Sequence, residues 1–204
     1  MVANMSPSAR RELTLRKDAD SRAGEEIKIV FSGPMGAGKT TAIAAISDIP
    51  PVVTEVGNND REAFDKATTT VALDFGQLEL DDGTVVRLYG TPGQERYSFM
   101  WSILGRGALG VILLLDGSQP DAMHQMNKYL EAFDGPLQAG TLVIGIGRSD
   151  QPGAAPIQAY QRQLERSALA VPIFRVDVRR RDDVLLLIET LMCQLEANSS
   201  REPS

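Results

Sequence analysis

The chain lacks several features that define whole classes of protein. It has a single cysteine, Cys193, so no disulfide can form within its 204 residues. Cys193 lies in an apolar helical run, where a free cysteine usually fills space, and we expect it to be buried in the core. No run of about 18 apolar residues occurs, so a membrane-spanning helix is not expected. The one histidine, His124, has no catalytic partner close by in the sequence, and we expect an ordinary exposed helix residue.

Basic residues are outnumbered by acidic ones. The chain has 21 Lys and Arg against 27 Asp and Glu, a formal net charge of −6 at pH 7. Binding to nucleic acid is therefore not expected. The N-terminus lacks the apolar stretch of a secretory signal, and the C-terminus lacks a lipidation box. We expect a cytoplasmic protein with no transmembrane segment, for which peripheral membrane association stays open.

Composition divides the chain into three parts. Residues 1–24 are polar and charged, which predicts a flexible N-terminal arm. Hydrophobic residues make up 43% of the chain and charged residues 24%, ordinary values for one globular domain, which we place at residues 25–197. Residues 198–204 are predicted to be a disordered C-terminal tail.

The strongest motif is Gly33-Pro34-Met35-Gly36-Ala37-Gly38-Lys39-Thr40, which matches G-x-x-x-x-G-K-[ST]. Glycine tolerates positive φ, so such a loop can curl with its backbone N–H groups pointing inward. These groups and the following helix N-terminus, which includes Thr41, form a site for the β- and γ-phosphates of a nucleotide. Lys39 adds a positive charge, and the Thr40 hydroxyl is a hard oxygen ligand that suits Mg²⁺.

Apolar strands alternate with helices, which predicts an α/β fold with a mostly parallel sheet covered on both faces. Ligands bind such sheets at the carboxyl ends of the strands. An Asp-Asp-Gly turn predicts one antiparallel hairpin, and a long polar connection is expected at residues 54–69. The expected strands are Ile27–Phe31, Thr70–Phe75, Gln77–Leu80, Thr84–Leu88, Val111–Leu115, Leu142–Ile146 and Pro172–Val176. The expected helices are Thr41–Ile46, Tyr97–Leu104, Asp121–Phe133, Ile157–Ser167 and Asp182–Ala197, the last capped by Asp182 or Asp183.

Two segments compete for the second magnesium element. Val111–Leu115 ends in Asp116, as in the Walker B strand of ATPases, but the next residue is Gly117 where a carboxylate would activate water. The alternative is the loop Thr91-Pro92-Gly93-Gln94-Glu95. There a glycine N–H can bond the γ-phosphate and a glutamine can orient the attacking water. This second interpretation also gives Thr70 a role near Mg²⁺.

The segment Thr70-Val71-Ala72-Leu73-Asp74-Phe75 resembles switch I and the second strand of Ras- and Rab-like small GTPases, and Gly93-Gln94-Glu95-Arg96-Tyr97 resembles their switch II. Residues 90–101 are more similar to a bacterial branch that includes conservon-type GTP-binding proteins and gliding-motility small GTPases. They are also similar to the β subunit of the signal recognition particle receptor. The resemblance covers residues 27–195. It implies a Ras-like G domain: a P-loop NTPase three-layer sandwich whose mostly parallel sheet has one antiparallel edge hairpin.

The resemblance also implies binding of GTP or GDP with Mg²⁺ and slow hydrolysis of GTP. Lys39 would contact the β- and γ-phosphates, and Thr40 and Thr70 would hold Mg²⁺. Gly93 would sense the γ-phosphate, and Gln94 would position water. A roadblock/longin-type regulatory protein is the implied partner, so we expect a monomer or a complex with that partner.

At the base, Asp150 matches the guanine-reading aspartate of the N-K-x-D motif. A carboxylate there accepts hydrogen bonds from the N1–H and amino groups of guanine, which adenine cannot supply. Arg148 would stack its planar guanidinium on the base. The backbone N–H of Val178 would meet the guanine carbonyl.

Three residues depart from the family pattern. Gly90 replaces the magnesium-linked aspartate of D-x-x-G, although the bacterial branch commonly lacks this acid. Gly147 replaces the asparagine of N-K-x-D and cannot make its bonds to the P-loop, so guanine affinity should be weaker. Met35 stands where a glycine is usual, and it should crowd the γ-phosphate and Gln94 and slow hydrolysis.

Two other functions stay open. The chain could be a nucleotide-binding interaction module with almost no catalytic activity, which all three departures favour. It could also be an ATP-using P-loop protein in which Asp116 serves as the Walker B aspartate.

Overall fold

The computed structural model describes residues 27–50, 52–56, 71–80 and 83–199. These residues form one mixed seven-stranded sheet with the strand order β2-β3-β4-β1-β5-β6-β7. Four neighbouring pairs are parallel, whereas β2 with β3 and β3 with β4 are antiparallel. The strands are β1 (Ile27–Ser32), β2 (Val52–Val56), β3 (Val71–Glu79), β4 (Val85–Gly90), β5 (Gly110–Asp116), β6 (Leu142–Gly147) and β7 (Ile173–Arg175).

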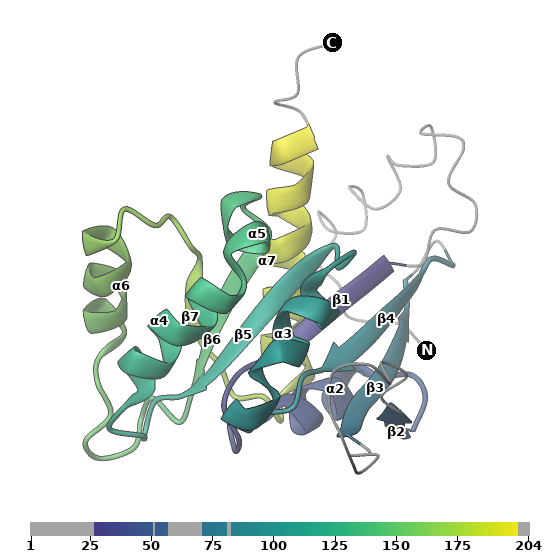
Figure 1. The fold of residues 1–204 in the computed structure, drawn as a ribbon, viewed down its shortest axis with the longest axis horizontal. Coiled ribbons are helices and arrows are strands. Elements are labelled where there is room, and N and C mark those ends of the chain that lie inside the picture. The colour runs from purple at the N-terminus through teal and green to yellow at the C-terminus, as the bar shows by residue number, and fades with distance from the viewer. Residues whose placement is uncertain (1–26, 51, 57–70, 81–82, 200–204) are drawn as a thin grey trace, which may run out of the picture.

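Helices cover both faces of this sheet (Figure 1). On one face, α2 and α7 pack against the sheet in a core that contains Ile43, Val184 and Leu191. On the other face, α3, α4 and α6 close a second core around Trp101 and Tyr129. The helices are α2 (Lys39–Ile46), α3 (Ser98–Gly105), α4 (Ala122–Ala132), α5 (Asp134–Gln138), α6 (Ile157–Arg166) and α7 (Arg181–Ser199), with a 3-10 helix, η2, at Glu95–Tyr97.

The central strand β5 explains why the sequence predicts this architecture well. All seven of its residues are buried, as a strand between two helical layers requires. Ile112 and Leu114 enter one core, whereas Leu113 and Leu115 enter the other. Because side chains alternate along a strand, one apolar run serves both layers. The predicted three-layer α/β fold is confirmed.

Four local predictions need correction. Residues 52–56, part of which were expected to lie in a polar connection, form β2 at the sheet edge beyond the predicted hairpin. Helix α5 was not expected, since its sequence contains Gly135 and Pro136. Cys193 is exposed rather than buried. Helix α7 continues through Asn198, whose side chain donates to the Ala139 carbonyl at 2.6 Å, so part of the predicted tail belongs to the fold.

The predicted cap of the last helix is also different. Asp182 and Asp183 lie inside the first turn of α7, which begins at Arg181. The Asp183 carboxylate accepts a hydrogen bond from the backbone N–H of Asp177 at 2.8 Å. Asp183 therefore fixes the loop that precedes the helix. In the part of the chain that the structure describes, no helix is long and apolar enough to cross a membrane.

Candidate nucleotide-binding site

The G-x-x-x-x-G-K-[ST] motif forms the loop between β1 and α2, at the carboxyl end of β1. Gly33 and Gly38 have φ angles of 138° and 94°, which residues with a Cβ rarely adopt. A Cβ on Gly33 would lie 2.0 Å from the Leu114 carbonyl oxygen on the neighbouring strand. One on Gly38 would lie 2.7 Å from Cγ2 of Val178. The loop can follow this path only because both positions are glycine.

Lys39 lies under the loop and is 7% exposed. Its ammonium donates to the carbonyls of Gly33 at 2.7 Å and Pro34 at 2.8 Å, so it is held within the motif. Burial lowers its pKa to about 8, although the nearby Asp74 carboxylate acts in the opposite direction. A cation that is buried without a full counter-charge is well suited to bind an anion such as a phosphate.

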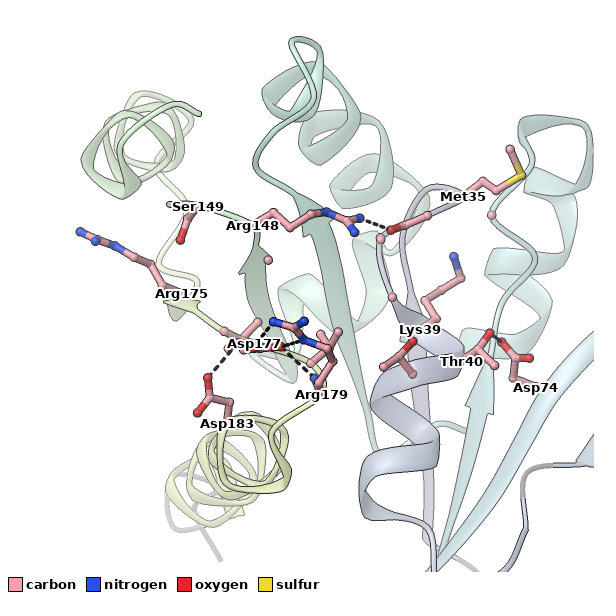
Figure 2. A pocket seen from close by; sticks show the side chains of 18 of the residues that line it. Met35, Lys39, Thr40, Asp74, Arg148, Ser149, Arg175, Asp177, Arg179 and Asp183 are labelled. Carbon is pink, nitrogen blue, oxygen red and sulfur yellow. Dashed lines mark hydrogen bonds and ion pairs between the residues drawn. The ribbon is translucent and has the colours of Figure 1, made fainter. Parts of the chain in front are cut away.

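Thr40 lies next to a carboxylate that the sequence did not indicate. Its hydroxyl donates to Oδ2 of Asp74 at 2.6 Å (Figure 2). Asp74 belongs to β3 and pairs in register with Gly90 on β4. A Cβ on Gly90 would lie 2.9 Å from both Cβ and Oδ2 of Asp74. The Asp74 carboxylate thus occupies the space into which a side chain at position 90 would extend.

A pocket of about 870 Å³ connects this region with the far end of the sheet. It lies at the carboxyl ends of β1, β4, β6 and β7, where a ligand of an α/β sheet is expected. Its lining residues are Met35–Thr41, Asp74, Thr91–Gly93, Gly147–Gln151, Arg175–Arg179 and Asp183. The P-loop and the predicted base-reading residues therefore share one cavity.

At the end of the pocket away from Lys39, the exposed residue Asp150 and Val178 lie on adjacent loops. A second carboxylate, Asp177, is held by Arg179 through Nε at 2.8 Å and Nη2 at 2.7 Å. These hydrogen bonds lower the pKa of Asp177 to about 2. Asp177 is thus committed to Arg179, while no hydrogen bond is seen for the Asp150 carboxylate within the described part of the chain.

Asp116 is also committed to an arginine. Its Oδ2 lies 2.8 Å from Nη2 of Arg148, and it accepts further bonds from Ser118 and Gln119. Burial opposes its ionisation, but these hydrogen bonds together lower its pKa to about 2. Thr40, the expected magnesium ligand, is bonded to Asp74 instead. This arrangement does not favour Asp116 as a Walker B aspartate.

The loop after β4 approaches the P-loop closely at one residue. A Cβ on Gly93 would lie 2.5 Å from the Met35 nitrogen and 2.8 Å from Nζ of Lys39, so only glycine can lie there. The loop is anchored by Trp101, which donates from Nε1 to the Pro92 carbonyl at 2.8 Å and stacks on Tyr129. This loop, which resembles switch II, therefore touches the site through its backbone.

Other predicted residues lie away from the pocket or outside the described chain. Gln94 is exposed, does not line the pocket, and immediately precedes η2. Glu95, next to it, pairs with Lys128 on α4. The Met35 side chain is 75% exposed and points away from Lys39 (Figure 2), so this conformation does not show the expected crowding. Thr70 falls outside the described residues.

The fold and this pocket define a P-loop nucleotide-binding domain. The chain is similar in structure to the G domain of the FeoB iron transporter of T. maritima, with a TM-score of 0.55 and 16% identity. The match covers 86% of this chain and 99% of that one. At this identity the match concerns the fold alone. No family model matches the sequence.

Proteins of similar sequence indicate which kind of P-loop domain this is. The chain is 28% identical to the Ras-related protein RABA4d of Arabidopsis thaliana over 156 residues, which cover 74% of this chain and 66% of that protein. It is 24% identical to the Ras-related protein RabC of Dictyostelium discoideum over 181 residues, 85% of this chain and 86% of that one. Together, these relatives and the G-domain fold support a Ras-like P-loop GTPase, consistent with a GTP-binding switch protein.

Proposed function

We propose that the chain is a guanine-nucleotide switch that binds GTP and GDP with Mg²⁺, hydrolyses GTP slowly and requires a partner for faster turnover. One observation carries this proposal: a single pocket is lined by the P-loop at one end and by Asp150 and Val178 at the other. The phosphates would lie against Gly36–Thr41 and the base against Asp150. The Asp150 carboxylate, for which the described residues show no hydrogen bond, favours guanine, because guanine presents two donors on that edge.

The magnesium site fits the residues that are present. Mg²⁺ requires hard oxygen ligands and keeps several waters. The Thr40 hydroxyl and the Asp74 carboxylate supply such oxygens 2.6 Å apart, and Asp74 lies in the space beside Gly90. Thr40 would hold the ion, with Thr70 as the second expected ligand and Asp74 close by. The bound ion would neutralise negative charge on the phosphates.

Slow hydrolysis follows from the position of Gln94. A water-positioning residue must reach the attacking water, yet Gln94 is exposed and outside the pocket lining. Switch II must therefore rearrange before Gln94 acts. A partner that binds this loop would stabilise the rearranged form, and the neighbouring α3 residues Phe99 and Ile103, 54% and 51% exposed, offer apolar contacts. A roadblock/longin-type protein is the partner implied by the family resemblance.

The first experiment is competition between GTP and ATP for the purified protein, with Lys39→Ala as the control for the site. We expect GTP to displace a labelled guanine nucleotide at much lower concentration than ATP, and Lys39→Ala to bind neither. Equal competition by ATP, or unchanged GTP affinity in Lys39→Ala, would contradict the proposal.

Single-turnover hydrolysis then separates a switch from an inactive binding module. Gln94→Ala should bind GTP as the wild type does and lose partner-stimulated hydrolysis. If the wild-type protein hydrolyses no GTP with or without a partner, the chain is an interaction module whose nucleotide is structural.

A further inference from the structure

Arg148 connects the base-reading loop with the P-loop through its side chain. Its guanidinium reaches from the base-reading loop to the P-loop, where Nη2 donates to the Gly36 carbonyl (Figure 2). The same nitrogen pairs with Asp116 at the end of β5. Three separate segments thus meet at one guanidinium: the ends of β5 and β6, and the P-loop.

The backbone of Arg148 needs support. Its φ is 50°, in the left-handed region that is unfavourable for a residue with a Cβ. The side chain is 51% exposed and gains little from burial. The Arg148 side chain opposes this cost through the ion pair with Asp116 and the hydrogen bond to Gly36. Strained residues persist where surrounding contacts fix them, commonly at functional sites.

Asp116 is held in a fixed position from which it can support Arg148. Its side chain is 8% exposed, and both carboxylate oxygens have partners, because Ser118 and Gln119 donate to it as well as Arg148. In the pairing of β5 with β6, Asp116 lies opposite Gly147. The backbone of the next residue, Gly117, donates to the Gly147 carbonyl at 2.8 Å. The carboxylate is therefore held rigidly beside the position from which the family's asparagine is missing.

We propose that Asp116 is a positioning residue for nucleotide binding: it holds Arg148 against the P-loop and thereby replaces the link that an asparagine at position 147 would make. This inference rests on the proposed guanine-nucleotide site. Arg148 contacts the nucleotide, and Asp116 acts through Arg148. Loss of Asp116 frees the base-reading loop from the P-loop, so bound nucleotide is released faster.

The test measures the release of a fluorescent GDP analogue after addition of excess GDP. Asp116→Asn keeps the shape of the side chain, and we expect release at least about tenfold faster, as for loss of a charged hydrogen bond. Arg148→Gln should give at least as large an increase, because it removes the contact with the nucleotide as well as the link. Because Asp116 acts through Arg148, the double variant should release the analogue about as fast as Arg148→Gln alone. Asp134→Asn, a matched change at an exposed carboxylate that accepts a hydrogen bond from Gln138 on the same short helix, should behave as wild type.

Rescue separates positioning from general stability. A Cβ on Gly147 would lie 3.6 Å from the Leu115 carbonyl and 3.8 Å from that of Val176, which are ordinary contacts. Gly147→Asn is therefore sterically tolerable, and in the Asp116→Asn background it should restore slow release. If Asp116→Asn does not fold, Arg148→Gln with and without Gly147→Asn gives the same test at an exposed side chain.

If Asp116→Asn releases the GDP analogue at the wild-type rate, the inference is overturned. Rate increases that multiply in the double variant would also overturn it, as would a failure of Gly147→Asn to slow release. Absence of GDP binding by the wild-type protein would overturn the proposed function as well, so the two failures are distinguishable.

Discussion

Raising the pH from about 8 to about 9.5 should stabilise the nucleotide-free protein through Lys39. Burial lowers the pKa of this residue from 10.5 to about 8 in the folded chain. Between these values the unfolded chain binds more protons than the folded one, so the free energy of unfolding rises with pH. With one pKa unit worth about 1.4 kcal/mol, the complete difference is about 3 kcal/mol, and about 1.5 kcal/mol of it is recovered over this interval.

Urea unfolding at a series of pH values measures this effect. For an m-value of about 2.5 kcal/mol/M, the midpoint should rise by about 0.6 M. Lys39→Met carries no titratable group at this position. Subtracting its urea midpoint from that of the wild type at each pH leaves the contribution of Lys39, since other residues titrate equally in both proteins. Burial raises the pKa of Tyr129 and Tyr160 in the folded chain, so these residues oppose stability as the pH approaches 10. They do so in both proteins, and their effect cancels in the subtraction. A midpoint difference between the two proteins that does not change with pH would refute the assignment of a depressed pKa to Lys39.

Three further outcomes follow from the site. Asp74→Asn should weaken nucleotide binding about tenfold in the presence of Mg²⁺. If variant and wild type bind nucleotide equally well in Mg²⁺, with a chelator as the control, Asp74 is not part of the magnesium site. Trp101→Phe keeps an aromatic ring against Tyr129 but loses the hydrogen bond to the Pro92 carbonyl. It should lower the free energy of unfolding by about 1–2 kcal/mol and the melting temperature by roughly 2–6 °C. An unchanged melting temperature would argue against this anchor. Gly33→Ala should destabilise the chain by at least about 3 kcal/mol, whereas Gly147→Ala, where the added carbon has room, should unfold near the wild-type urea midpoint.

The sequence predicts those features that depend on local pattern. The run Val111–Leu115 predicts a central strand, because it is short and continuously apolar. The glycines of the P-loop predict a tight loop, because glycine tolerates positive φ. Segments whose structure depends on distant partners were harder to predict. Strand β2 forms by pairing with β3 at the sheet edge. Cys193 lies in an apolar run, but the rotation of α7 leaves its side chain exposed.

The same limit applies within the site. Gln94 is identified by its motif, but it lies outside the pocket lining, in a loop that Trp101 anchors from α3 through the Pro92 carbonyl. The pairing of Asp177 with Arg179 was not expected, although the residues are two positions apart. Their spacing allows the bond but does not require it. Motifs identify which chemistry is available, whereas packing decides which of those groups face the ligand.

The two glycines that depart from the family pattern show how cross-strand pairing can preserve a site. Gly90 lies opposite Asp74 in the pairing of β3 with β4, and Gly147 lies opposite Asp116 in the pairing of β5 with β6. Opposed residues in a sheet are close neighbours, so a carboxylate can reach a site from either strand. At position 90 the Asp74 carboxylate fills the vacant space directly, while Asp116 acts through Arg148. A glycine in a nucleotide-binding motif is therefore not enough to infer a lost function. The residue paired with it on the adjacent strand must be considered first.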